Sequence, residues 1–311
     1  MKDRIETFLQ FLLGERGVSA NTVSAYRNDL SQFADYLAGA TDGGTPLAMV
    51  DRERLAGYFL HLKERGYAPA SVARKVAATK SFFHYLRRQG ELSADPTDGL
   101  GTPEVKKTPP RSISADDVRL LFQQAQVRES PEATRDVAML RGLYATGMRI
   151  SEMVTLDVQD ADLAEGTVEV AGRGGRSRLL PIDALTVRSL RAYLEKARPY
   201  LTRHDLAQTA LFLNHRGQRL TRQGFWLIMK ALVRDAGLTV LVTPHTLRHS
   251  FAAHRVGDGL ALQQLQQLLG HASLSTTQIY AQTPPAAPVA DHAARVPAPR
   301  PAPRGRQVVA A

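Results

Sequence analysis

The stretch "TPHTLRHSFAAH", residues 243–254, places three histidines and one arginine within twelve positions. Thr243 suits the N-cap of a helix, and Pro244 suits the first helical position, where its missing N–H costs nothing. The stretch therefore predicts a helix that begins here. Its side chains suit three kinds of site: a metal site, a catalytic site or the polar face of an ordinary helix.

Helical spacing separates this stretch into two faces. His245, Arg248 and His249 recur three and four residues apart and so share one face. The opposite side carries an apolar pair, Leu247 and Phe251. One face is expected to pack against the protein, and the other to display basic groups.

A zinc site is disfavoured by the residues between the two histidines. Arg248 would repel a dication, and Thr246 stands where a zincin carries its glutamate. We therefore expect no metal and no cofactor. A catalytic site and an ordinary helix both remain open on this stretch alone.

Length and composition describe a globular chain without thiol chemistry. The 311 residues are enough for two domains, and 43% hydrophobic with 23% charged residues is ordinary for a soluble protein. No apolar run reaches the length that a bilayer requires, so we expect a cytoplasmic protein with no membrane partner. The absence of cysteine excludes disulfides, thiolate metal ligands and thiol nucleophiles.

The charge indicates a polyanionic partner. The formal net charge is +10 and the isoelectric point is near 10.0. Lysine and arginine that neutralise phosphates release condensed counterions, so such a chain suits nucleic acid.

Residues 1–94 are predicted to form a helical domain, most simply a four-helix unit. Apolar residues recur at helical spacing in three stretches: Ile5, Phe8, Leu9 and Leu12; Val23, Tyr26, Leu30, Phe33 and Leu37; and Val72, Val76, Thr79, Phe83 and Leu86. The basic residues of this domain form either a solvated face or, if DNA is the partner, a phosphate-binding face: Arg74, Lys75, Lys80, Arg87 and Arg88.

The rest of the chain divides at composition changes. Residues 95–111, "DPTDGLGTPEVKKTPPR", are rich in proline and glycine and predict an interdomain linker. A second domain should span 112–283, with a β-hairpin at 167–182, "TVEVAGRGGRSRLLPI", and Trp226 in its core. Residues 284–311 are rich in proline and alanine and predict a disordered tail.

A break between two helices is expected near the end of this domain. Gly270 should end the helix of "LALQQLQQLLG", and the spacing of Ser275 and Gln278 predicts a capping box that opens the next. His271 then lies in the break, and Tyr280 lies in the second turn of the new helix.

Together these side chains suit phosphodiester chemistry. Two arginines and two histidines supply positive charge and donors for the oxygens of a phosphoryl transition state, and a tyrosine supplies an oxygen nucleophile. The candidates are Arg149, His245, Arg248, His271 and Tyr280.

Three segments carry a family resemblance. "ATGMRISE" (145–152), "HTLRHSFA" (245–252) and "LLGHASLSTTQIY" (268–280) resemble, in order and spacing, the signature boxes of the tyrosine recombinases (the phage integrase family). The overall layout is most similar to the Xer-type bacterial site-specific recombinases. The resemblance covers the chain up to about residue 283.

The resemblance implies a function and a role for each residue. Arg149, His245, Arg248 and His271 would hold the scissile phosphate of double-stranded DNA, and Tyr280 would attack it to give a 3′-phosphotyrosyl link. Glu152 would orient an arginine. Bond energy is kept in the covalent intermediate, so neither ATP nor a metal is implied.

The resemblance also implies an architecture. The fold class is mainly α with a small β-sheet: an N-terminal helical core-binding domain followed by a mixed α/β catalytic domain. Four protomers would assemble on two DNA sites, as a homotetramer or with a paralogous recombinase. In Xer-type proteins the segment after the nucleophile usually docks on a neighbouring protomer as a helix. Pro284, Pro285 and Pro288 argue against such a helix in this chain.

The hairpin turn departs from the family. Tyrosine recombinases normally carry lysine there as general acid for the leaving 5′-oxygen, whereas this chain carries Arg173. Arginine keeps the charge but is a poor proton donor, because its pKa lies above about 12. Two explanations remain open: codon drift at a tolerant position, or a real change of mechanism.

Several functions are compatible with these residues. The first is a site-specific recombinase that resolves chromosome dimers or integrates and excises a mobile element. The alternative is a DNA-binding architectural or regulatory protein of the same fold without cleavage. A third is a relaxing enzyme of the type IB topoisomerase kind.

Overall fold

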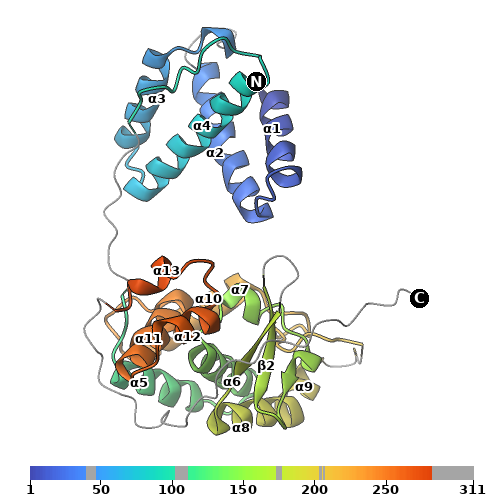
Figure 1. Ribbon diagram of the computed structural model, residues 1–311. Helices are drawn as coiled ribbons and strands as arrows, with labels where there is room; N and C mark the ends of the chain where they lie inside the picture. Colours follow the sequence, from blue (N-terminus) through green and yellow to red (C-terminus); the bar gives the residue numbers. More distant parts are fainter. Residues whose placement is uncertain (40–46, 102–110, 173–176, 203–204, 206, 282–311) are drawn as a thin grey trace. The chain divides into compact units, whose positions relative to one another are not determined.

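The computed structural model describes residues 1–39, 47–101, 111–172, 177–202, 205 and 207–281 (Figure 1). Arg173 and the predicted tail, which includes Pro284, Pro285 and Pro288, lie outside the described residues. The chain divides into two compact units, Met1–Thr108 and Pro109–Ala311. None of the helices in the described ranges combines the length and apolar character needed to cross a bilayer.

The N-terminal unit is helical, as expected. Its elements are α1 (Lys2–Gly14), α2 (Ala20–Gly39), the 3₁₀ turn η1 (Leu47–Met49), α3 (Arg52–Glu64) and α4 (Pro69–Arg88). The predicted stripes form its core, in which every predicted position is buried except the half-buried Tyr26. Aromatic rings fill the centre, where Phe33 lies 5.0 Å from Tyr58 between ring centroids. Burial of each large apolar side chain stabilises the fold by about 2 kcal/mol.

One of the five basic residues predicted on the surface of this unit lies inside it. Lys75 is only 3% exposed, and its ammonium donates to Asp29 at 2.9 Å and to Gln32 at 2.7 Å. Arg74 also pairs with Asp29, but it is exposed. The reason is register: Lys75 lies next to Val76 and three residues after Val72, on the core side of α4. A solvated face that includes Lys75 was therefore a wrong prediction.

The beginning of the predicted linker is bound to the N-terminal unit. Asp95 and Thr97 are buried, and the Asp95 carboxylate accepts hydrogen bonds from the backbone N–H and hydroxyl of Thr97. Lys80 donates to the carbonyl of Leu100, and Arg52 donates to that of Gly99. Residues 95–100 thus belong to this unit, although their proline and glycine content predicted a linker.

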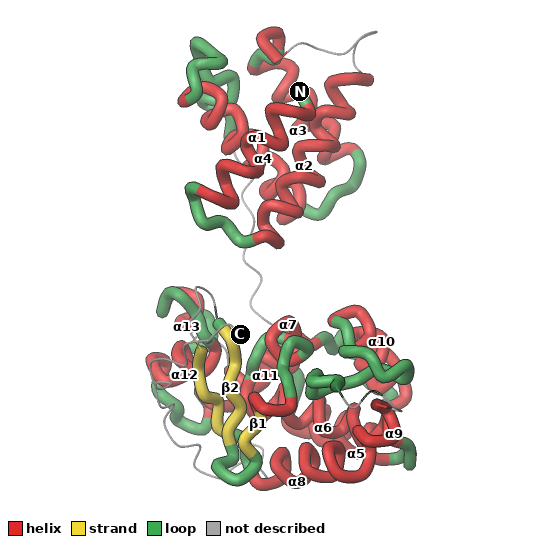
Figure 2. Tube along the Cα trace, turned by 90° about the vertical axis from the view of Figure 1, so that its right-hand side faces the viewer, coloured by secondary structure: helices red, strands yellow, loops and turns green. Residues whose placement is uncertain are grey.

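The second unit combines helices with a three-stranded antiparallel sheet of order β1-β2-β3 (Figure 2). The predicted hairpin pairs β2 with β3, with Val168 opposite Leu180. The elements are α5 (Ala115–Gln126), α6 (Pro131–Thr146), α7 (Ile150–Met153), η2 (Val158–Asp160), β1 (Ala161–Asp162), β2 (Thr167–Ala171), β3 (Ser177–Pro181), α8 (Ala184–Ala192), the π-helical turn η4 (Tyr193–Ala197), α9 (Arg198–Thr202), α10 (Arg222–Asp235), α11 (Pro244–Gly257), α12 (Leu262–Leu269) and α13 (Ser275–Gln278).

Helix α6 forms the centre of this unit. It contacts α5, α8 and α11, and it is buried on most sides from Ala138 to Thr146. Helices α11, α12 and α13 form a chain of contacts: α11 packs on α6 and contacts α12, and α12 contacts α13 (Figure 1). The C-terminal end of α6 is followed by α7, which contacts it, and Arg248 of α11 donates to carbonyls at the ends of α6 and α12.

Trp226 is not a core residue. The core face of α10 carries Phe225 and Met229, which are four residues apart and buried. Trp226 lies one position later, so it is turned by about 100° from that face and is 44% exposed. Its ring faces the ammonium of Lys230 at 5.3 Å. Helical register therefore places the indole outside, contrary to the prediction from the sequence.

The break after α12 forms as expected, whereas the predicted capping box does not. Gly270 is left-handed with φ 63° and ends α12. Leu274 precedes α13 with helical angles, φ −61° and ψ −31°. Ser275 therefore lies within α13 and not at its N-cap, and Tyr280 lies in the turn just after α13. The capping prediction was wrong because the chain enters α13 without an extended residue.

Candidate active site

The N-terminal part of α11 forms as its sequence predicts. The hydroxyl of Thr243 accepts a hydrogen bond from the backbone N–H of Thr246 at 3.1 Å. Leu247 and Phe251 are buried on the core side. This cap and apolar pair fix the rotation of α11. On the basic face His245 is exposed, whereas His249 is half-buried and Arg248 is buried, so this face is not displayed to solvent as the sequence predicted.

Arg248 is a buried cation held by backbone carbonyls. It is 3% exposed, and its guanidinium donates to the carbonyls of Gly147 at 2.5 Å and Leu269 at 2.7 Å. These carbonyls lie where α6 and α12 end. The last carbonyls of a helix have no intrahelical partner and carry partial negative charge, so the two helix ends stabilise the guanidinium. Burial, and then the charge of Arg149, lower the pKa of Arg248 to about 10, so it stays charged at neutral pH.

A glycine makes this approach possible. Gly147 ends α6 with φ 60°, and a Cβ there would lie 2.2 Å from the ring of Phe251. Only glycine adopts this angle without strain and leaves room for the ring. The "TG" of "ATGMRISE" is thereby linked to α11 by sterics as well as by the bond from Arg248.

Arg149 stands at the N-terminus of the short helix α7 and is exposed. It donates to the carboxylate of Glu152 at 3.1 Å and to the carbonyl of Gly270 at 3.4 Å. The same carboxylate accepts the backbone N–H of Arg149 at 2.6 Å. Glu152 thus contacts an arginine of the candidate site.

Arg178 on β3 is a further arginine that sequence reasoning missed. Its guanidinium donates to both carboxylate oxygens of Glu152, at 3.0 and 2.9 Å, and to the carbonyl of Leu268 at 3.0 Å. Burial raises the pKa of Glu152, but hydrogen bonds from Arg178 and the backbone of Arg149 outweigh it, and the pKa is lowered overall. Two arginines with one carboxylate leave this part of the site positive.

His271 is fixed in one tautomer. Its Nε2 lies 3.1 Å from the guanidinium of Arg248, and its Nδ1 lies 2.9 Å from the hydroxyl of Thr277. Arginine can only donate, so Nε2 must accept and the proton must lie on Nδ1. Burial, followed by the charges of Arg248, Arg149 and Arg178, lowers the pKa of His271 to about 4.

His245 and His249 lie side by side on α11. Their ring centroids are 4.1 Å apart, at an angle of 75° between the planes. His245 is exposed, and partial desolvation, then Arg248 and Arg149, lower its pKa. His249 is half-buried, and sequence reasoning noted its face without adding it to the candidate site. Its only sequence signal is the four-residue spacing from His245.

Tyr280 reaches the site from the turn after α13 and is 3% exposed. Its hydroxyl lies 2.5 Å from Nδ1 of His249. Burial raises the pKa of the phenol, and Arg248 opposes this only in part. The hydroxyl is therefore protonated at neutral pH and turned toward a histidine of α11.

The structure brings the five described candidates into one cluster. Arg149 and Arg248 meet at the ends of α6 and α12, His271 contacts Arg248, and His245 reaches Tyr280 through His249. The candidate DNA-binding residues of α4 lie in the other unit. No group of three or more metal-ligating side chains occurs among the described residues.

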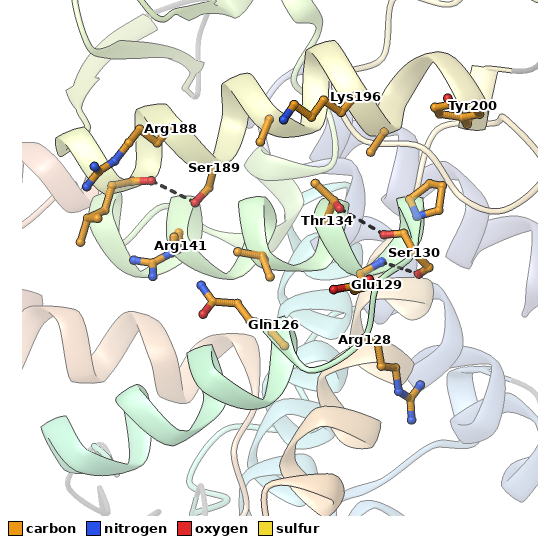
Figure 3. Close-up of a pocket in the computed structure, with 17 residues that line it drawn as sticks. Gln126, Arg128, Glu129, Ser130, Thr134, Arg141, Arg188, Ser189, Lys196 and Tyr200 are labelled. Atoms are coloured by element: carbon orange, nitrogen blue, oxygen red, sulfur yellow. Dashed lines mark hydrogen bonds between the residues drawn. The ribbon is translucent and has the colours of Figure 1, made fainter.

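A cavity of about 650 Å³ lies elsewhere in the second unit, where the loop before α6 faces α8, η4 and α9 (Figure 3). Ser130 and Thr134 on one side face Lys196 and Tyr200 on the other. None of the candidate site residues lines it. The cluster described above therefore lies outside this cavity, at the ends of α6 and α12.

Two family models match most of the chain. The Phage integrase family matches residues 111–286, and the Phage integrase N-terminal SAM-like domain matches residues 5–90. These ranges follow the two structural units.

Curated relatives match nearly the full length. The chain is 46% identical over 280 residues to "Tyrosine recombinase XerC" of Herpetosiphon aurantiacus, covering 90% of each chain. It is 43% identical over 280 residues to "Tyrosine recombinase XerD" of Listeria monocytogenes, covering 90% of this chain and 94% of that protein.

Solved structures share the fold. One is the XerH site-specific recombinase bound to a palindromic difH substrate, with a TM-score of 0.72 at 22% identity, covering 90% of this chain and 80% of that chain. Another is a lambda integrase dimer bound to a COC′ core site, with a TM-score of 0.70 at 18% identity over 90% and 94% of the chains.

Proposed function

Because this chain belongs to the phage integrase family of tyrosine recombinases, we propose that Tyr280 cuts and rejoins double-stranded DNA at a specific site. The tyrosine oxygen attacks the scissile phosphorus, forms a 3′-phosphotyrosyl link and releases a 5′-hydroxyl. The 5′-hydroxyl of a partner duplex then attacks that link. The energy of the broken ester is kept in the new one, so the exchange consumes no ATP.

The observation that carries this proposal is the fixed position of the arginines. Arg248 and Arg149 donate to carbonyls at the ends of α6 and α12, so they are held close together before DNA arrives. Repulsion between the cations is offset by Glu152 and by the helix ends. A phosphodiester that enters the cluster meets donors that need little rearrangement, and preorganised donors are the main source of transition-state stabilisation in such sites.

The proposed roles follow the contacts. Arg149, Arg248, His245 and His271 bind the oxygens of the scissile phosphate, with Glu152 orienting Arg149. Tyr280, whose hydroxyl lies at this cluster, supplies the attacking oxygen. We propose that Arg173 lies at the leaving 5′-oxygen, where its charge stabilises the transition state.

The N-terminal unit is proposed to bind the DNA backbone. Arg74, Arg87 and Arg88 are exposed on α4, and Lys80 is half-buried. Lys75 does not belong to this set, because its ammonium is used inside the unit. We also propose a tetramer on two DNA sites, of four copies or with a paralogous recombinase, acting in the cytoplasm, where bacterial DNA lies.

The biological role has two candidates, chromosome-dimer resolution and integration or excision of a mobile element. The relatives named XerC and XerD match over about nine-tenths of their length, which favours the first. The alternative, a DNA-binding protein without cleavage, is disfavoured because every box residue needed for cleavage is present. A type IB relaxing enzyme shares the chemistry but needs no partner duplex.

The test begins with the target site. Random-sequence duplexes are selected for binding to Tyr280→Phe, which cannot cleave, and the enriched sequence is built into a nicked suicide duplex. The wild-type protein should form a covalent adduct that survives denaturation, and Tyr280→Phe should form none. An adduct on Tyr280→Phe would remove Tyr280 as the nucleophile. Adduct formation without strand exchange between two duplexes would favour the relaxing enzyme.

A further inference from the structure

His249 is the residue of the cluster that the roles above leave unused. It lies one helical turn after His245 on α11, and its Nδ1 is 2.5 Å from the hydroxyl of Tyr280. The two ring centroids are 5.5 Å apart. Among the hydrogen bonds of the described residues, this is the one that the Tyr280 hydroxyl makes.

The direction of this hydrogen bond follows from the charges around it. His245 and Arg248 on α11 and His271 after α12 face His249, together with Tyr280 itself. Burial, and then these three neighbours, lower the pKa of His249 to about 4, so the imidazole is neutral at pH 7. Tyr280 is protonated. A neutral phenol therefore donates its proton to the lone pair on Nδ1.

A phenol must lose this proton to become a strong nucleophile. A general base has to lie within hydrogen-bond distance of the proton that it removes, which is about 2.6–3.2 Å between heavy atoms. Arg248 is close but charged, so it cannot accept. Nδ1 of His271 already carries a proton, which is directed at Thr277. Neither side chain can replace His249 in this position.

We propose that His249 is the base that accepts the proton of Tyr280 during cleavage. The inference rests on the function proposed above. The O–H proton passes to Nδ1 as the tyrosine oxygen bonds to phosphorus. The bond from phosphorus to the 5′-oxygen breaks, and a separate acid protonates that oxygen. On rejoining, the 5′-hydroxyl returns its proton to that acid as its oxygen attacks phosphorus, the bond from phosphorus to the tyrosine oxygen breaks, and His249 returns the proton to Tyr280.

Phosphate binding makes this transfer more favourable. The neighbours that keep His249 neutral are cationic or become so, and an incoming phosphodiester offsets their charge. The transition state carries one further negative charge, which stabilises the imidazolium beside it. His249 is thus neutral in the free protein and becomes a stronger base once DNA is bound.

The experiment isolates the nucleophile from the leaving group. The full-length protein is mixed with the selected suicide duplex, whose bridging 5′-oxygen is replaced by sulfur, so departure needs little acid. Adduct formation is followed in a single turnover between pH 5 and 9 for the wild type, His249→Asn and His249→Ala. His215→Asn, an exposed histidine outside the site, is the matched control. Thermal unfolding and DNA affinity are measured for each variant.

His249→Asn accepts the hydrogen bond but cannot hold the proton, so we expect adduct formation about 100-fold slower, with DNA affinity within about twofold of the wild type. In His249→Ala, added imidazole should restore part of the rate, which a misfolded variant would not show. His215→Asn should match the wild type.

Other results separate the two proposals. Unchanged or faster cleavage by His249→Asn would mean that the hydrogen bond from Tyr280 to His249 only holds the tyrosine in place, and the inference would be wrong. A slow His249→Ala that imidazole does not rescue would also overturn it. If the wild type formed no adduct, the proposed function itself would fail.

Discussion

Arg248 donates a hydrogen bond to Nε2 of His271 across 3.1 Å, and so it determines which nitrogen of that imidazole carries the proton. In this state Nε2 has no hydrogen to offer a phosphate oxygen. His271 can donate from that nitrogen only after Arg248 turns toward the phosphate or the ring gains a proton. In the free protein, this contact therefore keeps His271 in the tautomer that cannot donate from Nε2. Phosphate binding must break the contact or protonate the ring before His271 can donate from that atom.

Thr277 should control His271 from the other side of the ring. Thr277→Val removes the acceptor for Nδ1–H while keeping the volume of a side chain that is fully buried. We expect cleavage of the suicide duplex to fall on the order of tenfold, the lower end of the loss that follows when metal-ligating histidines lose such a partner. Thr277→Ser keeps the hydroxyl and should stay near the wild-type rate. Equal rates for both variants would contradict this role.

Glu152 should stabilise the second unit as well as orient Arg149. The side chain of Arg178 is mostly buried and pairs with the carboxylate of Glu152. Glu152→Gln removes that negative charge, so we expect a loss of about 2 kcal/mol in the free energy of unfolding. Denaturant unfolding of the full chain measures it, and the exposed Glu165→Gln is the control. A loss no larger than that of the control would show that the carboxylate is not needed for stability.

Gly147 should be the most sensitive glycine of the site. Gly147→Ala combines a left-handed residue with a Cβ 2.2 Å from the ring of Phe251, so we expect a loss of about 2 kcal/mol or more. Gly237 also has a positive φ, 67°, but nothing lies within 4 Å of its Cβ position. Gly237→Ala therefore measures the backbone strain alone, about 1 kcal/mol. Equal losses for the two variants would remove the role of Phe251.

Stability should fall in mild acid because of the histidines of the site. Both His249 and His271 have their pKa lowered from 6.5 to about 4. Between these values the unfolded chain binds more protons than the folded one, so stability is lost as pH drops from about 6.5 toward 4 and is constant with respect to these groups above that range. The melting temperature of His249→Asn should depend less steeply on pH in this window. An identical pH dependence would show that His249 titrates normally.

Arg173 gives the prediction that tests the departure from the family. Arginine cannot easily hand over a proton, so departure of the 5′-oxygen should limit cleavage. A bridging sulfur should then accelerate the wild-type protein markedly. Arg173→Lys should cleave ordinary DNA faster and gain less from sulfur. A slower Arg173→Lys would mean that the site is rebuilt around arginine or that Arg173 is not at the leaving group.

Local signals in the sequence were sufficient for the elements that carry the site. The cap at Thr243, the apolar pair on α11 and the glycine after α12 depend on neighbours within one or two turns, and each forms as expected. Tyr280 and the box arginines were identified by resemblance to a family. The helical and hairpin regions followed from periodicity.

Contacts between distant segments could not be predicted in the same way. The bond from Tyr280 to His249 joins residues 31 apart and depends on the path of α12 and the turn after it. Arg178 looked like one more charge in a basic hairpin, because nothing in its neighbourhood indicates the carboxylate 26 residues earlier. Lys75 and Trp226 were misplaced for a related reason, since one step of helical register decides between core and solvent.

The carbonyls that hold Arg248, Arg178 and Arg149 come from the main chain at residues 147 and 268–270. Every amino acid supplies such an oxygen. Substitutions at positions 268 and 269 that preserve α12 and its apolar contacts therefore keep the carbonyls that hold the three arginines. Only the two left-handed glycines are constrained in identity. Substitutions at positions 268 and 269 that keep α12 intact are therefore compatible with the observed positions of the three arginines, provided that Gly147 and Gly270 are kept.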